Sequence, residues 1–459
     1  MEQIAFDPTD AKGALNQLPH TAAVFALYGA EAHAEPYIGR TPNLRARLER
    51  LLQPSAKHPR RLQLAGRVRR IAWRLTGSEF ESLLTQFSLL EEIYGAKTLD
   101  RMHLGAPAFI RYLGSNAYPR ITVTNRPSQR EADWAYGPFQ SRAAAERFAD
   151  EALKLFLLRR CTDDLDPNPA HPGCVYSEMK MCLAPCYQGC TDHRYGEEAA
   201  AVEQFLASRG ESCLVTLRAQ RDEASAGLEF EKAAALHAQL QRVEGVRALA
   251  PELVRPLGRL RTVILQAAAS PDEVSVFLYE GGLLRGPVAF STLGMRIQNE
   301  QSGSSSLFAQ PMALEPIPES ADPAPSAISQ GLVTGHDFSR ADSGAEETGA
   351  SAPEGESREG KSPDEPAKIT TAPARLARGL LESRMEAALA ALAGATPNPS
   401  ATLRQGHLAL LKRWYYRPEI RRAGEIFFPD AEDHWPLKAM LRGAGRVAAK
   451  MMMSTAKQA

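Results

Sequence analysis

The chain has 459 residues, of which 44% are hydrophobic and 24% charged, a composition typical of a globular protein with two or three domains. Basic and acidic residues balance at 54 each, so the net charge alone indicates no class of partner. No run approaches the roughly 18 apolar residues of a membrane span, and the first residues lack the pattern of a signal peptide, so we expect a cytoplasmic protein without membrane association.

Residues 22–95 are expected to fold as strand, strand, helix, strand, helix. The segments AAVFALYG and PYIGR are short apolar runs broken by glycine, and TPNLRARLERLL follows with leucines at helical spacing. VRRIAWRLTG alternates as a strand does. In SEFESLLTQFSLLEEIYG, Ser78 is the expected helix cap and Glu81 stands in the capping-box position.

Further along the chain, PRITVTNR and WAYGPFQS predict a strand and a turn, and RAAAERFADEALKLFLLRRC predicts a helix. Two helical stretches are expected at 194–208 and about 213–250. Residues 261–292 predict three strands with a hairpin turn at EGG. Residues 300–372 are rich in Ser, Pro, Gly, Ala and Glu and are predicted to be disordered, before a helix at about 374–394.

These elements predict an α+β protein. Its expected parts are a small mixed-sheet domain, a Cys-rich metal module, a helical hairpin, a small β unit, a disordered linker and a short C-terminal helical segment with basic and aromatic residues. The expected boundaries are, in the same order, 20–98, 99–192, 193–250, 255–298, 299–372 and 373–459.

Positive charge is concentrated near the N-terminus. Residues 40–74 hold eleven Arg or Lys against one acid, Glu49. Such a surface suits contacts to DNA phosphates without base readout, although a solvated face that aids solubility remains the alternative. The candidate DNA-binding residues are Arg40, Arg45, Arg50, Arg60, Arg61, Arg67, Arg69 and Arg70.

The same region carries a recognisable motif. AVFALYG at 23–29 and YIG at 37–39, followed by Arg47, resemble the GIY-YIG nuclease domain. The later segment YGPFQSRAAAERFADEALKLFLLRRC resembles the bacterial UvrC-like excinuclease family, and the resemblance covers residues 20–295. It implies a DNA repair protein of the nucleotide excision type with a helix-borne glutamate that holds one Mg²⁺.

Within that resemblance, Tyr37 would activate the attacking water, Arg47 would steady the developing phosphate charge, and Arg40 would be a second cation beside the phosphate. Two positions depart from the motif. Phe25 lacks the first-triplet tyrosine hydroxyl, and Gln86 stands where the metal-binding glutamate belongs, although Mg²⁺ prefers carboxylate oxygens. We therefore expect a DNA-binding protein with a degenerate nuclease site. The alternatives are an active Mg²⁺-dependent endonuclease and a non-catalytic scaffold.

Five of the six cysteines fall within residues 161–190, which in a reducing compartment favours metal ligation over disulfides. Four of them follow the spacing C-x12-C-x7-C-x3-C: Cys161, Cys174, Cys182 and Cys186. This spacing lacks the paired knuckles usual for zinc and favours iron–sulfur, and the resemblance implies a [4Fe-4S] cluster. Cys190 is a fifth candidate, Cys213 is expected to be a buried small residue, and zinc or inert thiols remain alternatives.

Two further segments have two interpretations each. Residues 223–246 resemble the UVR motif by which UvrC-like proteins bind the helicase UvrB, but His237 and Ala238 stand where Arg and Asp are usual, and an ordinary packing helix is the alternative. A C-terminal aromatic run, Trp414 to Tyr416, is flanked by basic residues. It could stack on a nucleic-acid strand or could belong to a hydrophobic core.

Overall fold

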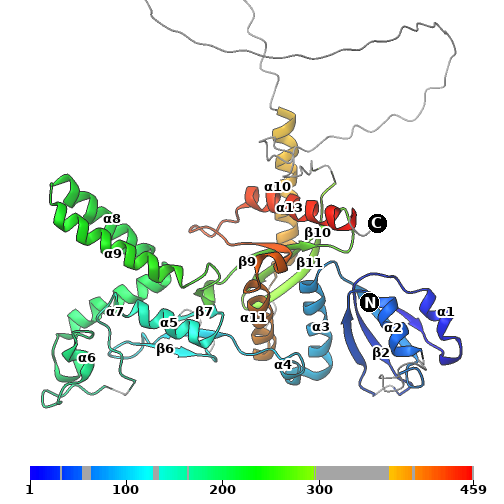
Figure 1. Cartoon of the computed structure of the whole chain (residues 1–459), viewed down its shortest axis with the longest axis horizontal. Helices are drawn as coiled ribbons and strands as arrows, with labels where there is room; N and C mark the ends of the chain where they lie inside the picture. Colours follow the sequence, from blue (N-terminus) through cyan, green and yellow to red (C-terminus); the bar gives the residue numbers. More distant parts are fainter. Residues whose placement is uncertain are drawn as a thin grey trace, which may run out of the picture.

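The structure is a computed structural model (Figure 1). It describes residues 1–31, 34–53, 64–127, 134–162, 165–293, 295, 372–394 and 399–456. Apart from Ala372, the expected linker 299–372 lies outside the described residues, as do Arg60 and Arg61. The described part is an α+β fold with three four-stranded sheets, all of whose strand pairs are antiparallel.

The first sheet has the order β1-β4-β2-β3. Its strands are β1 (Glu2–Ala5), β2 (Ala23–Tyr28), β3 (Tyr37–Thr41) and β4 (Arg70–Leu75). The expected succession of strands and helices over 22–95 is confirmed. The sheet was expected to be mixed, which is wrong, because β2 pairs antiparallel with both neighbours and β1 antiparallel with β4.

Helices cover both faces of this sheet. The helical elements of the region are η1 (Pro8–Asp10), α1 (Ala11–Asn16), α2 (Leu44–Leu52), α3 (Glu79–Tyr94), η2 (Gly95–Lys97) and α4 (Thr98–Arg101). Figure 1 shows α1 and α2 on one side of the sheet and α3 on the other. The leucines of α2 are buried against Phe25 and Leu27, as their helical spacing predicts.

The second sheet has the order β6-β5-β7-β8 and is covered by α5 (Arg142–Ala152). Its strands are β5 (Ala108–Tyr112), β6 (Ile121–Thr124), β7 (Ala135–Phe139) and β8 (Arg255–Pro256). The turn predicted for WAYGPFQS is wrong: β7 is a central strand with all five residues buried. The helix predicted to run to residue 161 ends at Ala152, because the apolar run after it buries Phe156 and Leu158 as irregular chain.

Short and long helices follow this sheet. They are α6 (Val175–Glu178), η4 (Pro185–Tyr187), α7 (Asp192–Ala207), α8 (Glu211–Ala226) and α9 (Phe230–Ala248). The single stretch predicted for about 213–250 is wrong, since α8 and α9 form a hairpin that projects from the rest of the molecule (Figure 1). The break comes at Gly227 and Leu228, and Leu228 has a left-handed φ of 60° that no α-helix contains.

The third sheet has the order β11-β10-β9-β12. Its strands are β9 (Thr262–Ala267), β10 (Glu273–Glu280), β11 (Leu283–Ser291) and β12 (Gly424–Phe427), and η5 (Leu257–Arg259) precedes them. The three strands predicted in 261–292 and the turn at EGG are confirmed. Gly281 and Gly282 form that turn with φ of 59° and 81°, a conformation that favours glycine at both positions.

The C-terminal segment supplies the fourth strand of this sheet. It contains α10 (Ala372–Leu392), α11 (Ala401–Tyr415), α12 (Glu419–Arg422), β12 and α13 (Leu437–Ala456). A purely helical segment was expected, and this is wrong because β12 pairs with β9. The parts expected at 255–298 and 373–459 therefore share one sheet.

Alternate residues of the third sheet enter two cores. Val263, Leu265 and Val276 pack with α10 and α13, whereas Ile264 and Phe277 pack with α3 and α11. Figure 1 shows these helix pairs on opposite sides of the sheet. Helix α3 therefore lies between the first and third sheets. Within the described residues, no helix is both long and apolar enough to span a bilayer.

Candidate functional site

The Tyr-Ile-Gly triplet opens strand β3, whose register against β2 is set residue by residue. Phe25 lies opposite Gly39 and Leu27 opposite Tyr37. The rings of Phe25 and Tyr37 lie 6.1 Å apart between centroids. A β-carbon at Gly39 would stand 2.7 Å from the Phe25 ring, so the glycine is required by the aromatic residue that crosses it.

Arg47 lies on α2, on the same side of the sheet as Tyr37. Asn43 caps this helix by accepting a hydrogen bond from the Ala46 amide at 3.0 Å. Arg45 pairs with Glu49 at 3.3 Å, whereas Arg47 is half-buried and has no carboxylate within 4 Å among the described residues. The structure thus gathers Phe25, Tyr37 and the Arg47 helix around one core.

Gln86 lies on α3, which covers the opposite face of the sheet. Strand alternation sends Tyr37 to the α2 side, and the next residue, Ile38, packs in the core that contains α3. Gln86 is half-buried, and in the described part of the chain no hydrogen bond joins it to Tyr37 or Arg47. The sequence places Gln86 at the metal position by resemblance, and the structure leaves that role a prediction.

The N-terminus of α3 is capped as expected. Ser78 Oγ accepts a hydrogen bond from the Glu81 amide at 3.1 Å. The Glu81 carboxylate reaches back to the amide of Gly77 at 3.0 Å, one residue before the position that a capping box uses. Glu81 is buried, and this burial raises the pKa of its carboxyl.

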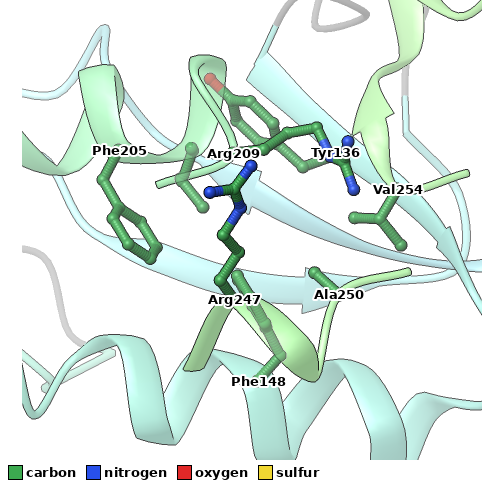
Figure 2. Close-up of a pocket in the computed structure, with 8 residues that line it drawn as sticks. Tyr136, Phe148, Phe205, Arg209, Arg247, Ala250 and Val254 are labelled. Carbon is green, nitrogen blue, oxygen red and sulfur yellow. The ribbon is translucent and has the colours of Figure 1, made fainter. Parts of the chain in front are cut away.

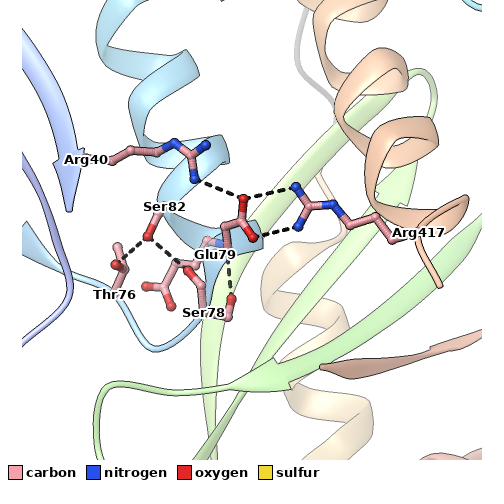
Figure 3. Close-up of polar contacts among 7 residues, drawn as sticks. Arg40, Thr76, Ser78, Glu79, Ser82 and Arg417 are labelled. Atoms are coloured by element: carbon pink, nitrogen blue, oxygen red, sulfur yellow. Dashed lines mark hydrogen bonds and ion pairs between the residues drawn. The ribbon is translucent and has the colours of Figure 1, made fainter. Parts of the chain in front are cut away.

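An ion-pair cluster at the first turn of α3 links three distant parts of the chain (Figure 3). The Glu79 carboxylate accepts two hydrogen bonds from Arg417, at 2.7 and 2.9 Å, and one from Arg40 at 3.1 Å. The hydrogen bond from Arg417 is the main cause that lowers the pKa of Glu79 to about 2, and Arg40 lowers it further. Arg40, expected to contact phosphate, is thus paired with a carboxylate in this structure.

Sequence reasoning missed the partner in this cluster. Arg417 was noted only as one of the cations beside the C-terminal aromatic run, and it lies 338 residues from Glu79. No local pattern connects positions so far apart. The aromatic residues and the helical pattern just before Arg417 indicate a packed helix. They do not indicate which residue Arg417 contacts.

Several other cations of the basic region lie on or just before β4, an inner strand of the first sheet that pairs with β1 and β2. Arg69 donates to the Gly66 and Val68 carbonyls at 3.0 and 2.8 Å, and Arg70 stacks over the Tyr28 ring at 4.0 Å. Six arginines of the basic region have no carboxylate within 4 Å in the ranges that the structure describes: Arg47, Arg50, Arg67, Arg69, Arg70 and Arg74.

The four candidate metal ligands lie in one neighbourhood around α6. Burial raises the pKa of the Cys182 thiol to about 11, and the nearby Cys161, Cys174 and Cys186 raise it further. Arg159 donates a hydrogen bond to the Cys161 sulfur at 3.5 Å. Across the described ranges, no three Cys, His, Asp or Glu side chains stand close enough together to surround a metal ion. The thiols therefore converge without forming a closed metal site.

The other two cysteines lie apart from this group. Cys190 and Cys213 are both partly buried against the core formed by the second sheet and its helices. Burial, followed by the charge of Asp192, raises the pKa of the Cys190 thiol.

The hairpin tip exposes apolar side chains. Leu228 and Phe230 are 72% and 67% exposed, in the turn and at the first residue of α9. The motif-like segment 223–246 therefore spans the turn of a hairpin. An apolar residue on a projecting tip is available to a partner, whereas Leu240 and Val243 of the same segment are buried.

The C-terminal aromatic residues are packed inside the protein. Trp414 is 2% exposed, its ring centroid lies 5.3 Å from that of Phe80, and its indole N–H donates to the Arg422 carbonyl at 2.9 Å. The Tyr416 hydroxyl donates to the Pro138 carbonyl at 2.8 Å. Of the two alternatives left open for this run, the hydrophobic core is confirmed for Trp414.

Comparison with known proteins identifies relatives of this arrangement. Residues 109–205, from β5 to α7 and including the cysteine-bearing loops, match a family model described as UvrC/Cho excinuclease, middle domain. The chain is 30% identical to UvrABC system protein C of Alcanivorax borkumensis over 242 residues, which are 53% of this chain and 39% of that protein. No solved structure matches the chain.

Other relatives carry the same name. The chain is 29% identical to UvrABC system protein C of Ruminiclostridium cellulolyticum over 303 residues, 64% of this chain and 48% of the relative. It is 26% identical to that of Aliivibrio fischeri over 239 residues, 52% of this chain and 39% of the relative. The chain thus spans less than half the length of these relatives. Over about half of its own length, it is related to the UvrC family.

Proposed function

We propose that this chain is a UvrC-like DNA-binding protein of the nucleotide excision repair type with a degenerate nuclease site. The relationship to UvrABC system protein C supports the setting. The observation that carries the proposal is the set of six arginines on and beside the first sheet that have no carboxylate partner among the described residues. Arginines without an acid nearby are available to phosphate oxygens.

The nuclease site is proposed to be degenerate because its metal position is neutral. Gln86 could offer an amide oxygen to Mg²⁺ but brings no charge. Glu79 is ionised, yet Arg40 and Arg417 already compensate its charge. Tyr37 and Arg47 match the motif's tyrosine and arginine, which is why the active endonuclease stays the second candidate.

DNA binding is tested by fluorescence anisotropy with two duplexes of unrelated sequence. We expect equal affinities that fall steeply with salt, since each phosphate contact releases counterions. Reversing Arg50, Arg67 and Arg69 to Glu should weaken binding more than about tenfold and flatten the salt dependence by about three contacts. Reversal of Arg142, an exposed residue of α5, is the control. Unchanged affinity in the triple variant would refute the assignment.

Catalytic status is tested by nicking of supercoiled plasmid with Mg²⁺. We expect no cleavage above background by the wild type and measurable cleavage by Gln86→Glu, because the substitution returns the missing charge. Adding Tyr37→Phe should abolish the gain, and Phe25→Tyr alone should do much less. Wild-type cleavage that Gln86→Glu does not improve would favour the active endonuclease.

We also propose that Cys161, Cys174, Cys182 and Cys186 hold a [4Fe-4S] cluster, supported by their spacing in the sequence and by the effect of the other three thiols on the pKa of Cys182. Such a cluster would supply a structural cross-link between the loops and a site for one-electron chemistry. Protein purified without oxygen should contain about four irons and absorb near 400 nm, roughly where thiolate-to-iron charge transfer is expected. Colourless protein with one bound zinc would refute this assignment.

The exposed hairpin tip supports a partner. We propose that Leu228 and Phe230 contact a UvrB-like helicase of the same repair system. Replacing both with Ser should reduce the affinity of such a helicase without changing DNA binding by the first sheet. Retained affinity would leave the hairpin as an internal packing element.

A further inference from the structure

Two arginines point into a shared hollow where the base of the helical hairpin meets the second sheet. Arg209 lies in the turn between α7 and α8, and Arg247 in the last turn of α9. Figure 2 shows both guanidinium groups entering the same space, a hollow of about 20 Å³ that opens to solvent. Its other walls are mostly apolar or aromatic: Tyr136, Phe148, Phe205, Leu206, Ala250 and Val254.

The carboxylates around this hollow are already paired with arginines, one of them with Arg247 itself. Glu211 accepts hydrogen bonds from Arg247 at 2.6 Å and from Arg218 at 3.4 Å. Glu252 pairs with Arg255 at 3.4 Å. Both carboxylates are about half exposed, so they lie at the rim and not within the hollow.

Arg209 is left without an acid. Its Nε is buried without a hydrogen-bond partner, and none of the carboxylates in the described ranges lies within 4 Å of its guanidinium. A buried polar N–H without a partner is costly and calls for an explanation such as a bound group. Positive charge at the hollow therefore exceeds the negative charge that the chain supplies there.

The electrostatics of the neighbouring arginines agree with this imbalance. Burial lowers the pKa of Arg209, and Arg247 lowers it further against the opposing effect of Glu252. Burial also lowers the pKa of Arg255, and Arg209 is the next cause. Arg209 is thus repelled by both Arg247 and Arg255 in a partly desolvated place, and an anion would relieve that repulsion.

The backbone at Arg209 gives an independent indication. Its φ is 54°, in the left-handed region that residues with a β-carbon rarely adopt. The following residue, Gly210, has a φ of 83°. A glycine or asparagine at position 209 would adopt this turn at a lower cost in backbone strain, so an arginine there suggests that its side chain has a binding role.

We propose that Arg209 and Arg247 form a binding site for a phosphate group, with Arg255 adding positive charge from the adjacent strand. The guanidinium fork matches two phosphate oxygens at once, and the mostly apolar walls offer few other hydrogen-bonding groups to compete for the two arginines. The phosphate could belong to a nucleic-acid backbone or to a small phosphate compound. The site lies on different elements from the basic region of the first sheet and does not depend on the function proposed above.

The test uses the full chain and the variant Arg209→Gly. Glycine suits the left-handed turn, so this variant should fold at least as stably as the wild type while it loses the cation. Arg221→Ala is the matched control, because it removes the same charge from a partly exposed position of α8 that does not line the hollow. Inorganic phosphate is titrated calorimetrically in chloride buffer at constant ionic strength, and a duplex oligonucleotide is titrated by anisotropy.

We expect inorganic phosphate to bind the wild type and Arg221→Ala alike, and Arg209→Gly about tenfold more weakly or worse, because a charge-assisted hydrogen bond is lost. A parallel loss of duplex affinity identifies the source as a nucleic-acid backbone, and unchanged duplex affinity identifies a small phosphate compound. The proposal is overturned if phosphate does not bind the wild type, or binds Arg209→Gly equally well. The arginine reversals in the first sheet test the other proposal separately.

Discussion

His407 makes the C-terminal segment sensitive to acid. It lies on α11 and is 6% exposed, with its Nδ1 accepting a hydrogen bond from the Leu284 amide at 3.0 Å. Its ring centroid lies 5.3 Å from that of Phe87 on α3. Burial, and then the charge of Arg285, lowers the pKa of His407 to about 4, so the native state holds the neutral imidazole.

The free energy at stake follows from the two pKa values. An unfolded histidine has a pKa of about 6.5. Between pH 6.5 and 4 the imidazole is therefore protonated in the unfolded chain but neutral in the native state. The stabilisation is complete above pH 6.5 and is lost as the pH falls toward 4. At pH 5 the loss from this one residue is about 2 kcal/mol, and the full difference is about 3 kcal/mol.

The assay is urea unfolding at pH 7 and pH 5, followed by tryptophan fluorescence, for the wild type and His407→Asn. Asparagine offers a carbonyl oxygen near the position of Nδ1 but does not titrate. Subtracting the two proteins cancels the other titrating groups. We expect the wild type to lose about 2 kcal/mol more than the variant on acidification. Equal losses would show that His407 titrates normally and that its burial has been misjudged.

Two other predictions concern the contacts of α3. A β-carbon at Gly406 would stand 2.1 Å from the buried Phe87 ring, so Gly406→Val should lower the free energy of unfolding by about 2 to 3 kcal/mol. The control is Gly379→Ala, at a position with open space around it, which should be neutral or slightly stabilising in the same urea titration. Glu79→Gln should lower the free energy of unfolding by only about 1 kcal/mol, since the carboxylate is 49% exposed. The same variant should bind duplex DNA several-fold more tightly in anisotropy, because it releases Arg40. Weaker binding would show that Glu79 positions Arg40 for DNA.

Local sequence patterns predicted secondary structure most accurately where the pattern of buried residues and the turn residues agree. The strands of 261–292 carry apolar residues toward two cores, and two consecutive glycines close the hairpin, so both signals indicate the same structure. The strand β7 was mistaken for a turn because WAYGPFQS contains Gly137 and Pro138, which usually mark turns. Neighbouring strands on both sides make it a buried central strand, and that pairing is not visible in the segment itself.

The helical hairpin shows how an apolar pattern can mislead. Leu228 continues the helical spacing of apolar residues in 223–246, which predicted one packed helix. In the structure it occupies a left-handed turn and is largely exposed. The signal for the break was Gly227 just before it, since glycine often follows the end of a helix. A single glycine within a regular pattern was not enough to decide between one continuous helix and two helices joined by a turn.

Contacts between segments that lie far apart in the chain could not be predicted from the sequence. The segment GEIFF gives a short apolar run, but nothing in it indicates that β12 will pair with β9, about 160 residues earlier. The partner of Glu79 was missed for the same reason. The candidate residues themselves, Tyr37, Arg47 and Gln86, came from a motif, and their elements were predicted correctly because the motif includes its own secondary structure.

The packing of α3 fixes the position of Gln86, the residue that the resemblance places at the metal position. Phe80, Leu83 and Phe87 are each at most 3% exposed, and Glu79 ties the first turn to Arg417. A helix held on both sides cannot rotate to bring another residue into the position of Gln86 without disrupting two cores. Replacing Gln86 should therefore change one side chain without moving the helix. For that reason a single substitution, Gln86→Glu, is a sufficient test of the degenerate site, and a failure to gain cleavage would place the defect elsewhere, on the Phe25 and Tyr37 side of the sheet.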